Sequence, residues 1–358
     1  MTSTFPVRVA LTLLLALAGA LVCVWLRTPI PWMMGPLLVT SLASVLGRPT
    51  RSFSLFRNAG QWIIGCAVGL YFTPAVISLV SGLWWAIALT IAWALGVGWG
   101  LGLWLARTNG AFMGGTPDQQ LATGCFSGAI GGASEMTLLA ERVGARADLV
   151  AAAHSVRLLI VTLSVPFALS LSGVHGLDAT LPGPRVVHYP GLLLLLAVTG
   201  GGAYLMQLTG RANPWFTGPL MIAMGLTLAG VEWSSMPQWL TNCAQLVIGV
   251  SLGVRFSPAF VRTAPRWLAM SALSSVATVL LCAGFAVLLG LASGLHWSTM
   301  VLGTSPGGIA EMAITAKVLQ LGVPVVTSFQ ICRVVAVLVL VEPIYRLSVR
   351  RSKASASR

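Results

Sequence analysis

Long apolar runs separated by short polar segments dominate the chain. Six runs, at 7–26, 83–106, 149–171, 191–208, 267–291 and 323–345, are long enough for a helix to cross about 30 Å of hydrocarbon. Four shorter apolar runs occur at 30–46, 58–71, 214–230 and 239–254. Glycine-rich interruptions near 124–132 and 303–308 prevent a continuous helix there. The pattern predicts an all-α polytopic membrane protein with about ten crossings and two hairpins or broken helices.

The same motifs occur twice along the chain. PWMMGPL at 31–37 returns as PWFTGPL at 214–220, QWIIG at 61–65 as QLVIG at 245–249, and GGASEM at 131–136 as GGIAEM at 307–312. An arginine follows the glutamate of each GGxxEM motif at the same distance in both copies. A duplication of this length in a membrane chain is typical of secondary transporters. We expect membrane repeats at 1–175 and 186–348, followed by a basic cytoplasmic tail at 349–358.

Composition supports the membrane assignment. The 358 residues have a mean hydropathy of +0.88 and only 8% are charged, whereas about a quarter are charged in an ordinary soluble domain. The run at 7–26 is longer than a typical signal-peptide core and lacks a small-residue cleavage site after it, so we interpret it as the first span. The lipid bilayer is therefore the first partner that the sequence predicts.

Charge and metal-binding residue types exclude several function classes. The net charge of +13 comes from short loops and the C-terminal tail, as the positive-inside rule requires, so no nucleic-acid partner is expected. The six cysteines and four histidines are dispersed without the spacing of a metal site or a disulfide framework. We expect no metal, no cofactor and no enzyme activity.

Charge also predicts the orientation of the two repeats. An odd number of crossings, about five in each half, would place the second copy upside down relative to the first. Three arginines lie in the loop 47–57, whereas the matching segment 232–238 has no lysine or arginine. The corner after Tyr71 is uncharged, whereas its counterpart at 254–266 carries three arginines. This exchange favours inverted repeats in a bacterial inner membrane, with both termini in the cytoplasm.

The glycine-rich interruptions are the strongest candidate site. A short helix is expected to start after each one, with Ser134-Glu135 or Ala310-Glu311 in its first turn. A helix start presents unpaired N–H groups and a partial positive charge, which suit a substrate anion. The alternative is a tight packing corner that the glutamate completes. The candidate solute-binding residues here are Gly131, Gly132, Ser134, Glu135, Gly307, Gly308 and Glu311.

Two arginines within apolar runs extend this site. Arg157 and Arg333 need a partner or water, because a lone charge inside the membrane costs several kcal/mol. Each could form a structural ion pair with a glutamate, or neutralise a substrate carboxylate. His154 and Gln330 precede these arginines by three residues and so share a helix face with them. They favour a polar cavity, with helix–helix hydrogen bonding as the alternative.

The PWxxGPL segments place prolines within short spans. Pro36 and Pro219 each remove a backbone hydrogen bond, and the freed carbonyls could coordinate Na⁺ or only permit close packing. Gln61 and Gln245 carry amides that can bridge such backbone. These two glutamines complete the candidate residues for ion coupling.

The duplicated PWxxGPL, GQxxxG and GGxxEM patterns resemble the AbrB membrane family of bacteria over nearly the whole chain. Members of that family are labelled ammonia monooxygenase or AbrB-type regulator. The resemblance implies an integral inner-membrane protein with a link to gene regulation, and a helix arrangement like that of transporters with inverted five-helix repeats. The first copy departs from the pattern, because Ile130 stands where the second copy has Pro306.

Neither inherited label fits the residues, since the chain has no copper or iron constellation and no room for a DNA-binding module. The leading hypothesis is a gradient-driven secondary transporter of a small solute, such as an organic anion, that binds between the two interruptions with H⁺ or Na⁺ as coupling ion. The alternative is a membrane sensor that regulates gene expression indirectly, without transport. The sequence leaves the oligomeric state open, a homo-oligomer included.

Overall fold

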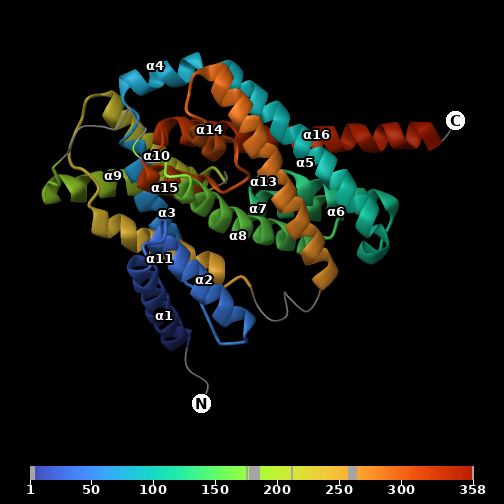
Figure 1. Cartoon of the computed structure of the whole chain (residues 1–358), viewed down its shortest axis with the longest axis horizontal. Coiled ribbons are helices and arrows are strands. Elements are labelled where there is room, and N and C mark those ends of the chain that lie inside the picture. Colours follow the sequence, from blue (N-terminus) through green and yellow to red (C-terminus); the bar gives the residue numbers. More distant parts are fainter. Residues whose placement is uncertain (1–4, 175, 177–185, 211–212, 257–263, 357–358) are drawn as a thin grey trace. The chain divides into compact units, whose positions relative to one another are not determined.

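The structure is a computed structural model that describes residues 5–174, 176, 186–210, 213–256 and 264–356 (Figure 1). Within these residues all regular structure is helical. The first copy forms α1 (Phe5–Trp25), α2 (Pro31–Val45), α3 (Ser54–Gly69), α4 (Pro74–Gly82), α5 (Trp84–Met113), α6 (Pro117–Gly128), α7 (Ala133–Arg142) and α8 (Ala147–Leu171).

The helices of the second copy follow in the described residues. This copy forms α9 (Tyr189–Leu208), α10 (Pro214–Leu228), α11 (Gln238–Gly253), α13 (Pro265–Ser293), α14 (Trp297–Thr304), α15 (Ile309–Leu319) and α16 (Val323–Ala356). The tail expected at 349–358 continues α16 as far as Ala356. Part of the basic corner expected at 254–266 lies outside the described residues.

By length and apolar composition, the described helices include fewer candidate spans than the ten crossings that the apolar pattern predicts. Within the described residues, six helices are long and apolar enough to span a bilayer: α1, α5, α8, α9, α13 and α16. α3 and α4 together form a seventh candidate, bent by 89°. α2 and α10 have 15 residues each, about 22 Å of helix, which is less than the hydrocarbon thickness. The chain is a multi-pass membrane protein, and five crossings in each half stay a prediction.

The chain divides into two compact units that each combine elements of both copies. The first unit comprises 1–82, 162–263 and 310–327, and the second comprises 83–161, 264–309 and 328–358. α1–α4 and α9–α11 therefore belong to the first unit. α5–α7, α13, α14, the first part of α8 and most of α16 belong to the second.

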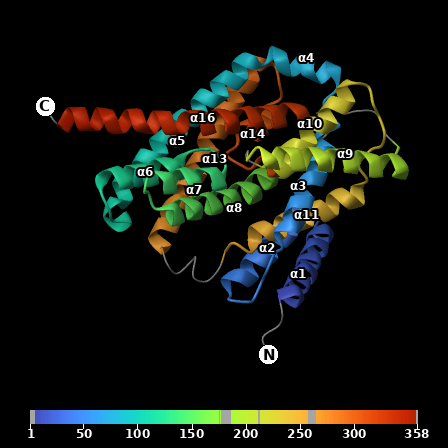
Figure 2. The same cartoon turned by 180° about the vertical axis from the view of Figure 1, so that it is seen from behind.

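Packing in the first unit pairs each copy with the other. α2 packs on α11 and α3 packs on α10, while α1 covers α2 and α9 covers α10 (Figure 2). Glycines permit these contacts, because a Cβ at Gly65 would overlap the carbonyl oxygen of Phe216, and one at Gly249 would overlap that of Met33. The QxxxG segment of each copy, 61–65 and 245–249, is thus the surface on which the PWxxGPL motif of the other copy packs.

The two PWxxGPL helices also begin alike. Ile30 and Asn213, the residues before the first proline, both adopt the left-handed conformation, with φ of 49° and 48°. This conformation is rare for a β-branched residue such as isoleucine. Pro36 and Pro219 lie inside their helices, which continue through them. These matched features agree with the sequence duplication, while the inverted orientation of the halves stays a prediction.

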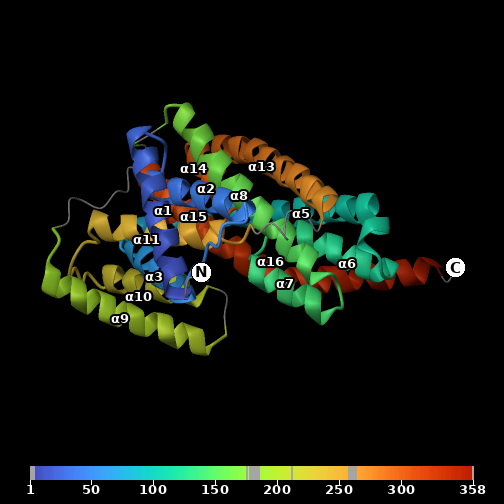
Figure 3. The ribbon, with the colours of Figure 1, turned by 90° about the horizontal axis from the view of Figure 1, so that it is seen from below.

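The second unit is built around two long helices, α5 and α13, which pack on each other (Figure 1). The rings of Trp93 and Phe285 stack between them at 4.8 Å. α6 packs along α5, and α14 packs along α13 (Figure 3). Residues of α16, including Val337, Val341 and Tyr345, complete an apolar core with α6 and α7. This frame holds both helix interruptions.

Candidate functional site

The first interruption separates α6 from α7 at residues 129–132. α6 ends at Gly128, and Ala129 turns to an extended conformation with φ −56° and ψ 131°. The chain re-enters a helix at Ala133, with Glu135 in the first turn as the sequence predicts. Because the helix stops there, the last carbonyl groups of α6 have no partner within the helix.

Arg157 on α8 supplies hydrogen bonds to carbonyls of the interruption itself. Its Nη1 donates to the oxygen of Ala129 at 2.8 Å, and its Nη2 donates to that of Gly131 at 3.1 Å. His154, one turn earlier on α8, contacts the oxygen of Phe126 through Nε2 at 2.9 Å. A guanidinium at a helix C-terminus also meets the negative end of the helix dipole. The interruption is therefore closed by side chains of α8.

The second interruption, at residues 305–308, has the same arrangement. Ser305 turns with φ −55° and ψ 140°, close to the angles of Ala129. Arg333 on α16 donates to the oxygens of Ser305 at 2.5 Å, Gly307 at 3.2 Å and Thr304 at 3.3 Å. Gln330 donates to the oxygens of Leu302 and Ser305. We call each set of contacts an arginine clamp: Arg157 with His154, and Arg333 with Gln330.

The clamps also determine the tautomer of His154. Its Nδ1 lies 2.7 Å from Nη2 of Arg157, just as Oε1 of Gln330 accepts from Nη2 of Arg333 at 2.6 Å. A guanidinium can only donate, so Nδ1 accepts and the proton sits on Nε2. His154 is therefore a neutral donor–acceptor pair, like the glutamine amide in the second copy. This geometry is that of helix–helix hydrogen bonding, the alternative to a polar cavity that the sequence leaves open for His154.

Both clamp arginines are buried and lie near each other. Arg157 is 5% exposed and Arg333 is 1% exposed, and each leaves its Nε without a partner. The two guanidinium groups are within electrostatic range of one another and of Cys282 on α13. Cys282 packs with Ile130 of the first interruption, and its carbonyl accepts from the Thr304 hydroxyl beside the second. The second unit thus brings both interruptions around one segment of α13.

The glutamates of the GGxxEM motifs take different positions. Glu135 is half-buried and its carboxylate folds back over Gly132, while Ser134 is exposed. Among the residues that the structure describes, no ion pair joins Glu135 to Arg157. Glu311 belongs to the first unit, where it is 8% exposed. There it lies within electrostatic range of Arg57 and Arg255.

The remaining candidates belong to the first unit. Gln61 on α3 is half-buried and Gln245 on α11 is buried, on two helices that pack together. Beside Gln61, the Trp62 indole donates to the Thr199 hydroxyl at 3.0 Å. In the second unit, the glycines of both interruptions lie at the arginine clamps, where the carbonyls of Gly131 and Gly307 accept hydrogen bonds.

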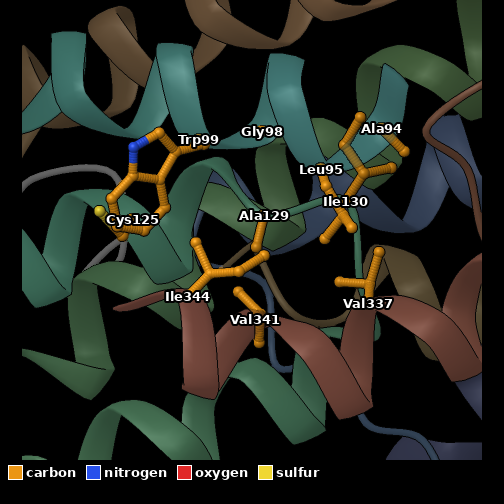
Figure 4. Close-up of a pocket in the computed structure, with 10 residues that line it drawn as sticks. All are labelled: Ala94, Leu95, Gly98, Trp99, Cys125, Ala129, Ile130, Val337, Val341 and Ile344. Atoms are coloured by element: carbon orange, nitrogen blue, oxygen red, sulfur yellow. The ribbon is translucent and has the colours of Figure 1, made fainter. Parts of the chain in front are cut away.

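Two small cavities adjoin the first interruption. One is apolar and lies between α5 and α16, where Trp99, Ala129, Ile130 and Val337 are among the residues that line it (Figure 4). The other is polar and borders Arg157 and a row of hydroxyl residues on α13. That row is absent from the candidate residues predicted above, although its hydroxyls recur at helical spacing within an apolar span. No cluster of three metal-ligating side chains occurs in the described part of the chain.

Comparison with known proteins identifies the family. A family model described as "Transition state regulatory protein AbrB" matches residues 32–348. The chain belongs to the AbrB family. It is 24% identical to "Uncharacterized protein YhjN" of Bacillus subtilis (strain 168) over 92% of this chain and 90% of that protein. It is 26% identical to "Putative regulator AbrB" of Escherichia coli (strain K12) over 87% of both chains. The AbrB resemblance predicted from the duplicated motifs is confirmed.

Proposed function

We propose that this AbrB-family protein is a gradient-driven secondary transporter of a small organic anion. The observation that carries the proposal is the pair of arginine clamps at equivalent interruptions, both in the second unit. Interrupted helices inside a membrane protein are tolerated where they line a cavity or are covered by protein, and paired interruptions are the usual place of a transport site.

Charge favours an anion as the solute. Arg157 and Arg333 are buried, near each other, and bonded to neutral carbonyls, so their positive charge is available to a carboxylate. The start of α7, next to Gly131 and Gly132, adds the positive end of a helix dipole. The solute would bind between the interruptions, with Gly307 and Gly308 on the side of the second copy.

A gradient is the energy source in this proposal, because the sequence contains no phosphate-binding loop of the GxxxxGK[ST] type. The coupling ion is H⁺ or Na⁺, with Glu311 as the carboxylate that takes it up. We place the protein in the bacterial inner membrane with cytoplasmic termini. Arg57 and Arg255, which this orientation puts on the same side, are within electrostatic range of each other.

Uptake into sealed liposomes tests the proposal. Detergent-purified protein is first screened by thermal shift against mono- and dicarboxylates, since a ligand that binds the folded state raises its melting temperature. The hits are then offered as radiolabelled solutes to proteoliposomes under a pH or Na⁺ gradient. We expect gradient-dependent uptake of at least one carboxylate. Binding without uptake under either gradient would overturn the transporter assignment.

Glu311→Gln tests the coupling role. The substitution removes the charge but keeps the shape, so we expect the protein to stay folded and gradient-driven uptake to fall at least ten-fold. Glu141→Gln is the matched control, because Glu141 is an exposed carboxylate on α7 and is not among the candidate site residues. Equal uptake by Glu311→Gln and wild-type protein would contradict a coupling role for Glu311.

A second function, a membrane sensor that regulates gene expression without transport, has the family names in its favour. The matched family model and the Escherichia coli relative are both named for regulation. The liposome assay separates the two functions, since a sensor binds its solute and moves none. A change in target-gene expression by a variant that binds but does not transport would then establish the sensor.

A further inference from the structure

A cavity lined largely by polar side chains lies among α5, α6, the first part of α8 and α13, within the second unit. Ser127, Arg157, Ser271, Ser274, Ser275 and Thr278 line it, and each of them is at most 6% exposed. The cavity is small, about 10 Å³, close to the lower limit for one water-sized occupant. Burial of so many hydroxyl groups in a mostly apolar protein requires a physical explanation.

Three donors in this cavity have no partner in the protein. The Oγ atoms of Ser127 and Ser271 and the Nε of Arg157 are buried and make no hydrogen bond. Ser275 and Thr278 use their protons on backbone carbonyls of α13, each at 2.7 Å. An unpaired buried donor is destabilising, so three in one cavity indicate an occupant that accepts hydrogen bonds.

The charge around the cavity is positive. Arg157 borders it, Arg333 is within electrostatic range, and no carboxylate lines it. The carbonyls in the arginine clamps accept from Nη1 and Nη2 of each guanidinium but carry no formal charge. Buried charges in a membrane are ordinarily paired with an opposite charge. Two adjacent cations therefore favour an anion over a neutral water.

We propose that this cavity binds a small monovalent anion, held by the hydroxyls of Ser127 and Ser271 and by Nε of Arg157. A free halide such as chloride and the carboxylate of a small solute share the required chemistry, a negative charge with several acceptor directions. The site requires no transport, so a sensor would hold the ion equally well. A failure of the protein to bind an anion at this site, and a failure to transport a solute, are therefore separate outcomes.

Chloride binding to the full chain tests the site. Purified protein in nanodiscs is titrated with chloride, and with formate as the carboxylate probe, against gluconate at constant ionic strength. Thermal shift and equilibrium binding of radiolabelled chloride are the two readouts. We expect saturable binding of chloride or formate, weaker binding of the larger iodide because the cavity is small, and no effect of gluconate. Whichever of the two probes binds more tightly identifies the source of the anionic group.

Removal of single hydroxyls locates the site. Ser127→Ala and Ser271→Ala should each weaken binding about ten-fold, the loss expected for one hydrogen bond to a charged group. Ser271→Thr, which keeps the hydroxyl, should restore most of it. Ser251→Ala is the matched control, because this buried serine on α11 already donates to the carbonyl of Ile248 and does not line the cavity.

Two results would overturn the inference. The first is that neither chloride nor formate binds to folded wild-type protein, which leaves water as the occupant. The second is that binding is equally tight in Ser127→Ala, Ser271→Ala and Ser251→Ala, which places the anion elsewhere. Size-exclusion chromatography of each variant verifies folding before titration. If an alanine variant fails to fold, Ser127→Cys or Ser271→Cys, with a much weaker donor in place of the hydroxyl, takes its place.

Discussion

The two helix interruptions share a backbone arrangement but differ in side chains. Each begins with a residue in an extended conformation, and each is closed by an arginine and by the residue three positions earlier. The first copy uses His154 where the second uses Gln330, and the first has Ile130 where the second has Pro306. The contacts that both copies keep are those that satisfy the freed carbonyls.

The surroundings of the interruptions differ more. The first copy carries the unpartnered hydroxyl of Ser127 beside a polar cavity. At the equivalent position the second copy has Gly303, whose α-carbon lies against the ring of Phe329. Glu135 is half-buried, whereas Glu311 is buried. The comparison indicates that the arginine contacts are common to both interruptions, while the polar surroundings have diverged between the copies.

Replacement of the clamp arginines gives the largest expected effect. Arg333→Ala leaves the carbonyls of Thr304 and Gly307 without a donor, because Ser305 keeps its bond from Gln330, and Arg157→Ala leaves those of Ala129 and Gly131. At roughly 1–3 kcal/mol for each unsatisfied group, both variants should lose several kcal/mol. Melting temperature and monodispersity in detergent measure the loss. A melting temperature equal to that of the wild-type protein in both variants would contradict a structural role for the clamps.

His154 gives an intermediate effect that depends on the replacement. His154→Gln copies the second clamp, so stability should change by less than about 1 kcal/mol. His154→Leu has similar volume but leaves the oxygen of Phe126 and one N–H of Arg157 unpaired, which should cost about 2–4 kcal/mol. The difference between the melting temperatures at pH 5.5 and pH 8 should be the same for His154→Gln and for the wild-type protein. A pH dependence present only in wild type would contradict the neutral tautomer.

Ile130→Pro gives the smallest expected effect. It introduces the residue found in the second copy, and the ψ of 131° at Ala129 suits a following proline. Ile130 packs with Ala94 and Cys282, so the smaller ring loses some contact, which the stiffer backbone offsets. We expect a change within about 1 kcal/mol in thermal or denaturant unfolding. A loss as large as that of His154→Leu would mean that the two interruptions differ in backbone after all.

Much of this architecture follows from the sequence. The apolar runs locate the long helices to within a few residues, except that α5 and α16 extend further. The paired glycines place both interruptions, and the equal glutamate-to-arginine spacing identifies Arg157 and Arg333 as related. His154 and Gln330 each precede an arginine by three residues, so the sequence places each of them on the same helix face as that arginine. These features depend on local backbone preference and helix periodicity, which a sequence expresses directly.

The partners of the arginines could not be predicted. The sequence suggested Glu135 or a substrate, because glutamates are visible in a sequence whereas unpaired carbonyls are not. Those carbonyls become acceptors only when the chain turns at Ala129 and Ser305. The cavity was missed for a related reason, since Ser271 and Ser275 lie on a helix far from Arg157 in the chain and only packing brings them together.

The most direct test is the position of the two guanidinium groups in an experimental map of the full chain in lipid nanodiscs. Arg157 is predicted within hydrogen-bonding distance of the oxygens of Ala129 and Gly131, and Arg333 within that distance of the oxygens of Ser305 and Gly307. The contradicting result is either arginine turned away from its interruption and paired with a carboxylate.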